Sequence, residues 1–200
     1  MISKKHFFLI IFSIVVAFIG REIYKYSHMY DLAWDAPAFQ TMGDENAPVT
    51  IIEFVDYNCP YCRTVHPVVQ EVLNMRSDIH YIARPIGPLS DNSEKLVKLT
   101  LAAGLQGKFW EMHHAFLSYK GRINDKVADQ IAEENGVDLE QLYADATGEE
   151  VNEYFRANVA ASGALGIRFI PGFMINKTIF VPDSENLTAQ DFLRVINDAT

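Results

Sequence analysis

The chain contains only two cysteines, and they are separated by two residues in the segment CPYC at positions 59–62. An apolar run rich in β-branched residues, VTIIEFV at 49–55, ends shortly before them, as expected for a strand buried on both faces. Pro60 suits the first turn of a helix, which we expect to continue to about Met75. The pattern therefore places both sulfurs where a buried strand meets the N-terminus of a helix.

This position favours redox chemistry over an inert staple, because a disulfide closing so small a loop constrains the unfolded chain very little. The sulfur of Cys59 is expected to face unpaired backbone N–H groups and the positive end of the helix dipole, and both stabilise a thiolate. The dipole contributes only about 0.3–1 kcal/mol, whereas one pKa unit is about 1.4, so N–H···S hydrogen bonds must account for most of any large shift. Cys62, one turn deeper, is predicted to be the buried resolving partner.

The N-terminus carries an export signal. Lys4 and Lys5 precede an uncharged, largely apolar run at 7–20 (FFLIIFSIVVAFIG), and the positive-inside rule places everything after Arg21 beyond the membrane. Fourteen helical residues span about 21 Å, less than the roughly 30 Å of a hydrocarbon core, so a signal peptide and a signal anchor both stay open. No small-x-small cleavage site follows the run, which favours the anchor. No cysteine follows it either, which excludes a lipidated cysteine.

The rest of the chain is long enough for one globular domain. We expect a signal peptide or anchor at 1–25, a tether at 26–37 and a single domain at 38–200, entered by a strand near 38–42. The first 26 residues hold four of the 17 Lys and Arg and one of the 26 Asp and Glu, which leaves a net charge of −12 for the remainder. This acidic balance argues against nucleic-acid binding.

Hydrophobic periodicity predicts an α/β order. A second strand is expected at 79–84, and a hairpin of two strands turns at Asn176-Lys177. A closing helix begins near Thr188 and Asp191, which have capping-box spacing. Between the second strand and the hairpin lies a helical insert at about 90–165, with helices expected at 94–106, 108–119, 126–135, 139–146 and 149–165.

Three segments carry a family resemblance: EFVDYNCPYCR, RPIGPLSDNSEKLVKLTLAAGLQGKFWEMHHAF and ALGIRFIPGFMIN. From about Phe39 to the C-terminus the chain resembles the DsbA-like thioredoxin family. Glutaredoxins also use CPYC, but they are too short to contain the helical insert with QGKFWEMHHAF. The resemblance implies a thioredoxin-like α/β fold with an inserted helical domain, and a dithiol oxidase that needs no cofactor. Such an enzyme donates a disulfide to folding secreted proteins through a mixed disulfide at Cys59.

The resemblance also assigns residues around the dithiol. Pro171 matches the family's cis-proline opposite the sulfurs, which would leave the backbone of Ile170 free to pair with an extended substrate; a trans proline in a turn is the alternative. Pro60 and Tyr61 are expected to tune the redox potential. Strongly oxidising members carry histidine at the position of Tyr61, so we expect a milder oxidant. Ile170 is closer to the thioredoxin pattern, which leaves a reductase or isomerase open.

Glu53 occupies the position of the family's buried acid beneath the dithiol. An unpaired carboxylate in an apolar strand is costly, so we expect a raised pKa and a role in relaying a proton to or from Cys62. An outward-facing Glu53 would have no such role. Asp56 and Arg63 flank the motif and are expected to be solvated or capping residues.

The alternative to a redox enzyme is a copper- or zinc-binding accessory protein, in which cysteines and histidines would form a metal site. Cys59, Cys62 and His66 have a spacing that could place three ligands on one helical stripe, and His113-His114 could add a fourth. A histidine at such a position is more often an ordinary polar helix residue, so we predict no metal. The aromatic residues of the insert, Phe109, Trp110 and Phe116, recur at helical spacing and are expected in the core rather than in a substrate groove.

By resemblance, the expected partners are unfolded or reduced secreted proteins and a DsbB-like membrane protein that reoxidises the dithiol with quinone. The expected location is the bacterial periplasm, with the domain tethered to the inner membrane by residues 7–20.

Overall fold

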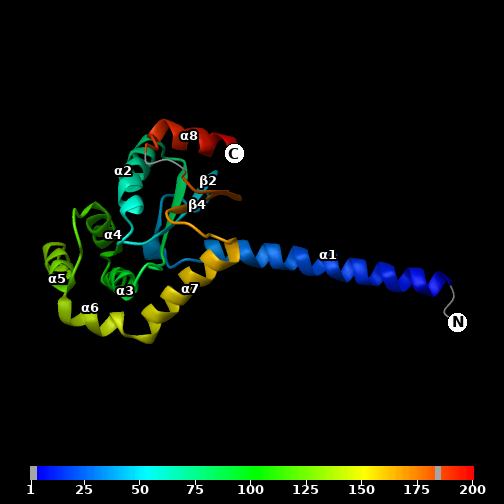
Figure 1. Ribbon diagram of the computed structural model, residues 1–200, viewed down its shortest axis with the longest axis horizontal. Helices are drawn as coiled ribbons and strands as arrows, with labels where there is room; N and C mark the ends of the chain where they lie inside the picture. The colour runs from blue at the N-terminus through cyan, green and yellow to red at the C-terminus, as the bar shows by residue number, and fades with distance from the viewer. Residues whose placement is uncertain (1–3, 183–185) are drawn as a thin grey trace.

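The computed structural model describes residues 4–182 and 186–200, and in its first helix it describes the side chains of residues 10–24 and 29 onward. A five-stranded sheet is covered by helices on both faces, and a long N-terminal helix projects away from this body (Figure 1). The strands are β1 (Thr41–Met42), β2 (Val49–Val55), β3 (Ile79–Pro85), β4 (Gly172–Ile175) and β5 (Thr178–Phe180). The helices are α1 (Lys4–Trp34), the 3-10 turn η1 (Ala38–Gln40), α2 (Pro60–Met75), α3 (Asp91–Leu105), α4 (Phe109–Ser118), α5 (Asp125–Glu134), α6 (Leu139–Ala146), α7 (Glu149–Leu165) and α8 (Ala189–Asp198).

The sheet has the strand order β1-β3-β2-β4-β5. Strands β2 and β3 are parallel, and the other neighbours are antiparallel. Strand β2 lies at the centre, and all but one of its residues are buried, which explains its apolar sequence. Within it, Glu53 pairs with Ala83 of β3 on one side and with Phe173 of β4 on the other. The acid therefore lies in the middle of the sheet.

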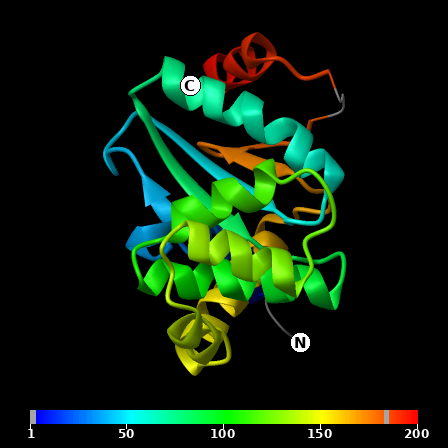
Figure 2. The ribbon, with the colours of Figure 1, turned by 90° about the vertical axis from the view of Figure 1, so that its left-hand side faces the viewer.

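Two apolar layers hold the sheet between helices. On one face Ile51 and Val55 belong to the large core that includes Val65 of α2 and Phe192 of α8. On the other face a smaller cluster joins Ile52 and Phe54 of β2 to residues of α1 and α7. In the view of Figure 2, α3 to α6 lie together in the lower half of the molecule, and α2 and α8 lie in the upper half. The predicted α/β order, with a helical insert between the second long strand and the C-terminal hairpin, is confirmed.

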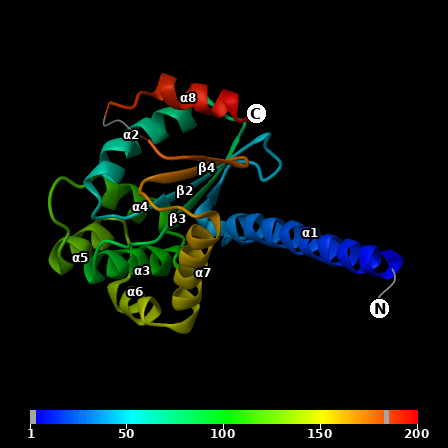
Figure 3. The same cartoon turned by 45° about the vertical axis from the view of Figure 1, so that its right-hand side comes forward.

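The N-terminal segment differs from expectation. Helix α1 continues to Trp34 and so includes most of the segment 26–37 that was predicted as a tether. Figure 3 shows its C-terminal end beside α7 and the rest extending outward. The cause is tertiary, because only this end packs on the body: Ala33 is fully buried against Ala161 of α7 and the apolar face of β2.

The predicted entry strand at 38–42 is reduced to η1 and the two residues of β1. The predicted transmembrane helix at 7–20 is not confirmed: in the part of the chain that the structure describes, no helix is both long enough and apolar enough to cross a membrane. The side chains of residues 7–9 lie outside the described ones.

A buried arginine that the sequence reasoning missed fixes the end of α1 to the sheet. Arg84 of β3 is fully buried, and its guanidinium donates to the backbone carbonyls of Leu32, Ala33 and Asp35, at 3.0 Å and 2.8 Å for the first two. It also donates to Asn158 Oδ1 at 3.0 Å. A cation at the C-terminal end of a helix satisfies carbonyls that have no helical partner. Arg84 therefore links α1, β3 and α7.

Replacement of this arginine should be strongly destabilising. In Arg84→Met the carbonyls at the end of α1 lose their charged donor inside the core, and we expect the free energy of unfolding to fall by about 3 kcal/mol. Urea unfolding followed by circular dichroism measures the change. Arg156→Met is the matched control, because Arg156 forms an exposed ion pair with Glu149 and should contribute less than about 1 kcal/mol. Equal losses in the two variants would contradict the proposed role of Arg84.

Candidate active site

The two cysteines lie at the start of α2, as the sequence predicts. Cys59 is the N-cap residue of the helix, and its Sγ accepts a hydrogen bond from the backbone N–H of Cys62 at 3.3 Å. Both are free thiols, Cys62 is fully buried, and 6% of the Cys59 surface is exposed. Thiol chemistry with an outside partner must therefore begin at Cys59.

Two polar side chains fix the loop between β2 and α2. The Asp56 carboxylate is fully buried and accepts from the backbone N–H groups of Asn58 at 2.7 Å and Leu89 at 3.0 Å. The Asp56 carbonyl accepts from the N–H of Cys59 at 3.1 Å. Arg63 donates to backbone carbonyls of two loops at 2.8 and 2.6 Å. Asp56, expected as a solvated or capping residue, instead shapes the loop that presents Cys59.

The environment separates the acidities of the two thiols. Hydrogen bonds lower the pKa of Cys59 from 9.0 to about 6, first the one from the Cys62 thiol, then those from the backbone N–H groups of Cys62 and Tyr61; burial opposes them. Burial raises the pKa of Cys62 well above its ordinary value, and hydrogen bonding and charge at Cys59 add to this. At neutral pH Cys59 is therefore mostly thiolate and Cys62 is a thiol.

Glu53 points into the core rather than outward. It is fully buried, and the Tyr81 hydroxyl donates a short hydrogen bond to its Oε2, while Oε1 has no hydrogen-bond partner among the described residues. Burial raises the pKa of Glu53 to about 7, although the hydrogen bond from Tyr81 opposes this. The expected rise in the pKa of Glu53 is therefore found. The charge of Glu53 also contributes to the raised pKa of Cys62. Tyr81 was missed because nothing in the sequence pairs it with a residue 28 positions earlier.

The predicted cis-proline is present beside the dithiol. The Ile170–Pro171 peptide bond is cis, and the Cys59 thiol lies 3.8 Å from the carbonyl oxygen of Ile170. Ionisation of Cys59 removes the proton of this contact and leaves the carbonyl of Ile170 available to another donor. Gly172 follows, and a Cβ there would lie 2.8 Å from the Phe169 carbonyl oxygen and 2.7 Å from Ile167. Only glycine fits this close approach of backbone.

A groove of about 1010 Å³ opens at Cys59. Its walls come from the start of α2, the loop before α3, the second half of α7 and the segment leading to Pro171. Large apolar side chains line it while remaining open to solvent: Phe169 is 68% exposed, Leu89 55% and Val159 44%. Exposed apolar side chains around a reactive sulfur form a surface suited to an apolar segment of another chain.

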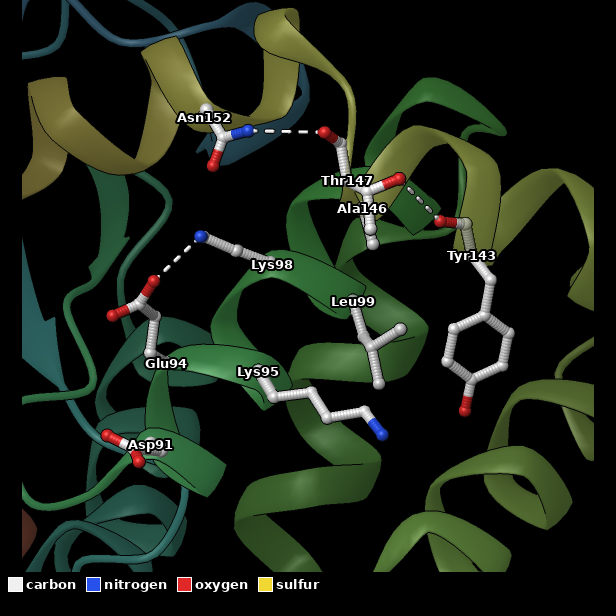
Figure 4. Close-up of a pocket in the computed structure, with 9 residues that line it drawn as sticks. All are labelled: Asp91, Glu94, Lys95, Lys98, Leu99, Tyr143, Ala146, Thr147 and Asn152. Atoms are coloured by element: carbon white, nitrogen blue, oxygen red, sulfur yellow. Dashed lines mark hydrogen bonds and ion pairs between the residues drawn. The ribbon is translucent and has the colours of Figure 1, made fainter.

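A smaller cavity of about 540 Å³ adjoins the groove along α3, sharing Asp91 and Glu94 with it (Figure 4). Its lysines are already paired: Lys98 with Glu94 and Lys95 with Asp125, both at 2.7 Å. No sulfur lines this cavity, so the redox chemistry belongs to the groove.

The aromatic residues of the insert lie in the core, as expected. Phe109 and Phe116 are buried, Trp110 is half-buried against them, and none of the three lines the groove. The grouping of His66 with the cysteines as metal ligands is not found. Among the described residues, the group suited to holding an ion is His66, His113 and His114, without either cysteine.

Comparison with known proteins places this site in a family. A family model described as thioredoxin matches residues 36–198. The solved thioredoxin-like oxidoreductase from Silicibacter pomeroyi DSS-3 has a TM-score of 0.77 and 29% identity, over 84% of this chain and 96% of that one. The thiol-disulfide exchange protein alpha-DsbA2 from Wolbachia pipientis has a TM-score of 0.77 and 24% identity, over 88% and 94%. A periplasmic thioredoxin-like protein from Salmonella enterica serovar Typhimurium has a TM-score of 0.73 and 19% identity, over 86% and 95%.

Curated relatives match only part of the chain. Over 103 residues it is 36% identical to the Na(+)/H(+) antiporter NhaA 1 of Salinispora arenicola (strain CNS-205). This match covers 50% of the chain and 16% of the antiporter, so the chain spans a small fraction of the length of that relative.

The lowered pKa of Cys59 can be measured directly. Thiolate absorbance at 240 nm, taken as reduced minus oxidised protein, should titrate with a pKa of about 6. In Cys62→Ala the pKa should rise towards 9.0, because its largest cause, the hydrogen bond from the Cys62 thiol, is removed while the backbone donors stay. Cys59→Ser is the control and should show no titration in this range. An unchanged pKa in Cys62→Ala would contradict the assigned cause.

Glu53 should make stability depend on pH. The folded chain keeps the proton of Glu53 up to about pH 7, whereas the unfolded chain releases it near 4.5, so rising pH favours unfolding between these values. We expect the wild type to lose about 3 kcal/mol of unfolding free energy over this interval that Glu53→Gln does not lose. Urea unfolding at pH 4.5, 5.5 and 7 measures it. Glu71→Gln, which removes an exposed carboxylate of α2, should keep the wild-type slope.

Proposed function

Because the chain belongs to the thioredoxin family, we propose that it is a thiol:disulfide oxidoreductase of the DsbA-like type and that it acts as a dithiol oxidase, which donates disulfide bonds to exported proteins. The observation that carries this proposal is the pairing of an accessible low-pKa sulfur with a buried high-pKa sulfur at one helix start. A stabilised Cys59 thiolate favours the reduced enzyme, and this makes its disulfide an oxidant.

The proposed reaction has two exchanges. A substrate thiolate attacks Cys59 Sγ of the enzyme disulfide, a substrate–Cys59 bond forms, and the electron pair of the broken bond goes to Cys62 Sγ, which takes up a proton. A second substrate thiolate then attacks the substrate sulfur of the mixed disulfide and expels Cys59 as a thiolate. The substrate loses two electrons and two thiol protons, and the enzyme becomes the dithiol. Low pKa makes Cys59 the better leaving group in the second step.

Glu53 is proposed to handle the proton of Cys62. A carboxyl with a pKa of about 7, buried on the dithiol side of β2, can donate to the leaving Cys62 thiolate and take the proton back on reoxidation. Its unpartnered Oε1 leaves one oxygen available for this exchange. Tyr81 holds the other oxygen and so orients the carboxyl.

The groove is proposed to bind the substrate. The open apolar side chains of Leu89, Val159 and Phe169 suit the apolar segments that a chain exposes before it folds. The Ile170 carbonyl beside Cys59 is placed to accept an N–H from such a segment in extended form. Binding through backbone and apolar contact predicts a broad substrate range.

Export and tethering rest on the N-terminal segment. Large apolar side chains from Ile10 to Ile23 project from α1 into solvent, and no charged residue stands between Lys5 and Arg21. We propose that this part of α1 enters the inner membrane and holds the domain on the periplasmic side, where a DsbB-like quinone-linked protein reoxidises the dithiol. The two lysines before the run favour this orientation.

The alternative activity that uses the same thiol-disulfide exchange is that of a reductase or isomerase. Tyr61, half-buried at the start of α2, brings no positive charge to the Cys59 thiolate, so we propose a milder oxidant than one with histidine there. Tyr61→His is then expected to shift the glutathione equilibrium towards the dithiol.

The oxidase proposal predicts transfer of disulfides from the purified protein. The oxidised full chain, mixed with a reduced unfolded protein, should lose its own disulfide while the substrate loses two thiols for each enzyme consumed. In cells, the Cys62→Ala variant should accumulate mixed disulfides at Cys59. Protease added to spheroplasts should degrade these mixed disulfides if the domain is exported. They should stay with the membranes after alkaline extraction if the N-terminal segment is an anchor. Glu53→Gln should slow resolution of the mixed disulfide more than its formation.

Cys59→Ser is the control, because it removes the attacked sulfur and should capture no partner. A reduced enzyme that cleaves substrate disulfides, together with an oxidised enzyme that leaves substrate thiols untouched, would establish the reductase instead. Mixed disulfides protected from added protease would contradict export.

A further inference from the structure

Three histidines lie close together where the dithiol helix packs against α4. His66 belongs to α2, and His113 and His114 belong to α4. One ring nitrogen from each lies within 4.8 Å of the others, and His114 Nδ1 and His66 Nε2 are 3.3 Å apart. His66 is 3% exposed and His113 is fully buried, while His114 is half-buried and provides the side open to solvent.

The two buried rings have nitrogen atoms without protein partners. His113 Nε2 and His66 Nδ1 have no hydrogen-bond partner among the described residues. Leaving a buried polar atom unpaired costs about 1–3 kcal/mol, so the unpaired Nε2 of His113 inside this cluster calls for an explanation. A bound cation would use the lone pair of His113 Nε2.

The surroundings of His113 are compatible with the tautomer that a cation needs. Its Nδ1 lies 3.0 Å from the hydroxyl oxygen of Tyr57. When Nδ1 carries the proton and donates it to Tyr57, Nε2 keeps its lone pair directed into the cluster. Ligating histidines in proteins are commonly held in this way, by a hydrogen bond from the nitrogen that does not bind the ion.

The three rings are neutral, which is the ligating form. Burial lowers the pKa of His66 to about 4, and burial also lowers the pKa values of His113 and His114. The acid nearest to this cluster on α4 is Glu111, whose charge acts against the lowering at His114. Binding an ion therefore requires no proton release at neutral pH.

We propose that His66, His113 and His114 bind one transition-metal cation of the class that prefers imidazole, Zn²⁺ in particular, with a fourth position open to solvent beside His114. Zn–N bonds of about 2.0–2.1 Å in a tetrahedron separate ligand nitrogens by about 3.4 Å, close to the 3.3 Å between His66 and His114. The site is separate from the dithiol, because neither cysteine belongs to the cluster. The ion would join α2 to the inserted helices through α4.

The test uses the oxidised full chain, in which the Cys59–Cys62 disulfide cannot ligate metal. Titration with Zn²⁺ in a calorimeter should show one equivalent bound, Zn²⁺ should raise the melting temperature, and Co²⁺ should give a visible spectrum without a thiolate charge-transfer band. His114→Gln, the most exposed of the three positions, should bind Zn²⁺ about tenfold more weakly or worse and lose the rise in melting temperature.

His80→Gln, which removes a histidine of β3 outside the cluster, is the matched control and should bind as the wild type does. His66→Gln provides a second cluster variant, and the melting temperature without metal shows whether each variant is folded. Absence of binding to the oxidised chain, or equal affinity in folded His114→Gln, would overturn the proposal. Binding by the reduced chain alone, lost in Cys62→Ala, would assign the metal to the dithiol instead.

Discussion

The site depends on the hydrogen bonds that the sulfur of Cys59 accepts at the start of α2, from the Cys62 thiol and from the backbone N–H groups of Cys62 and Tyr61. The first N–H groups of a helix have no helical partners, and a sulfur at the N-cap position can accept hydrogen bonds from them, which stabilises its thiolate form. The geometry holds because Asp56, buried below the loop, fixes the backbone at Asn58 and Cys59 and the neighbouring loop at Leu89. The polar core beneath the loop thus controls the reactivity of a sulfur at the surface.

Two buried charged side chains on neighbouring strands show how hydrogen bonding decides whether a group is structural or reactive. Arg84 finds acceptors at the end of α1 and on Asn158, so its charge is compensated and it acts as a link between elements. Glu53 receives one hydrogen bond and keeps one oxygen without a partner, so its charged form is poorly supported and its proton is exchangeable near neutral pH. A second donor at Glu53 would lower its pKa and remove that property.

Local signals in the sequence account for what could be predicted. Helix α2 begins and ends at the predicted residues, because Pro60 suits the first turn of a helix and the apolar face continues to Met75. The orientation of Glu53 rested on resemblance, since VTIIEFV is apolar on both faces and alternation cannot assign a side. The partners of Arg84 lie about 50 positions away, and the three histidines meet only when α2 packs on α4. Contacts of this kind need the tertiary arrangement, which local periodicity does not contain.

The fall in the pKa of Cys59 sets a limit on how oxidising the dithiol becomes. From 9.0 to about 6 the thiolate gains about 4 kcal/mol, but at pH 7 only the part of the shift below 7 stabilises the reduced protein, about 1.4 kcal/mol or 30 mV. Water in the groove screens the sulfur, so this value is an upper bound. Each further unit by which the pKa of Cys59 falls would add its full effect to the stability of the reduced protein at pH 7, whereas the fall from 9 to 7 contributes little. A residue that adds a donor or a positive charge in place of Tyr61 would therefore shift the potential by the full amount of the pKa change that it causes, about 30 mV for each unit.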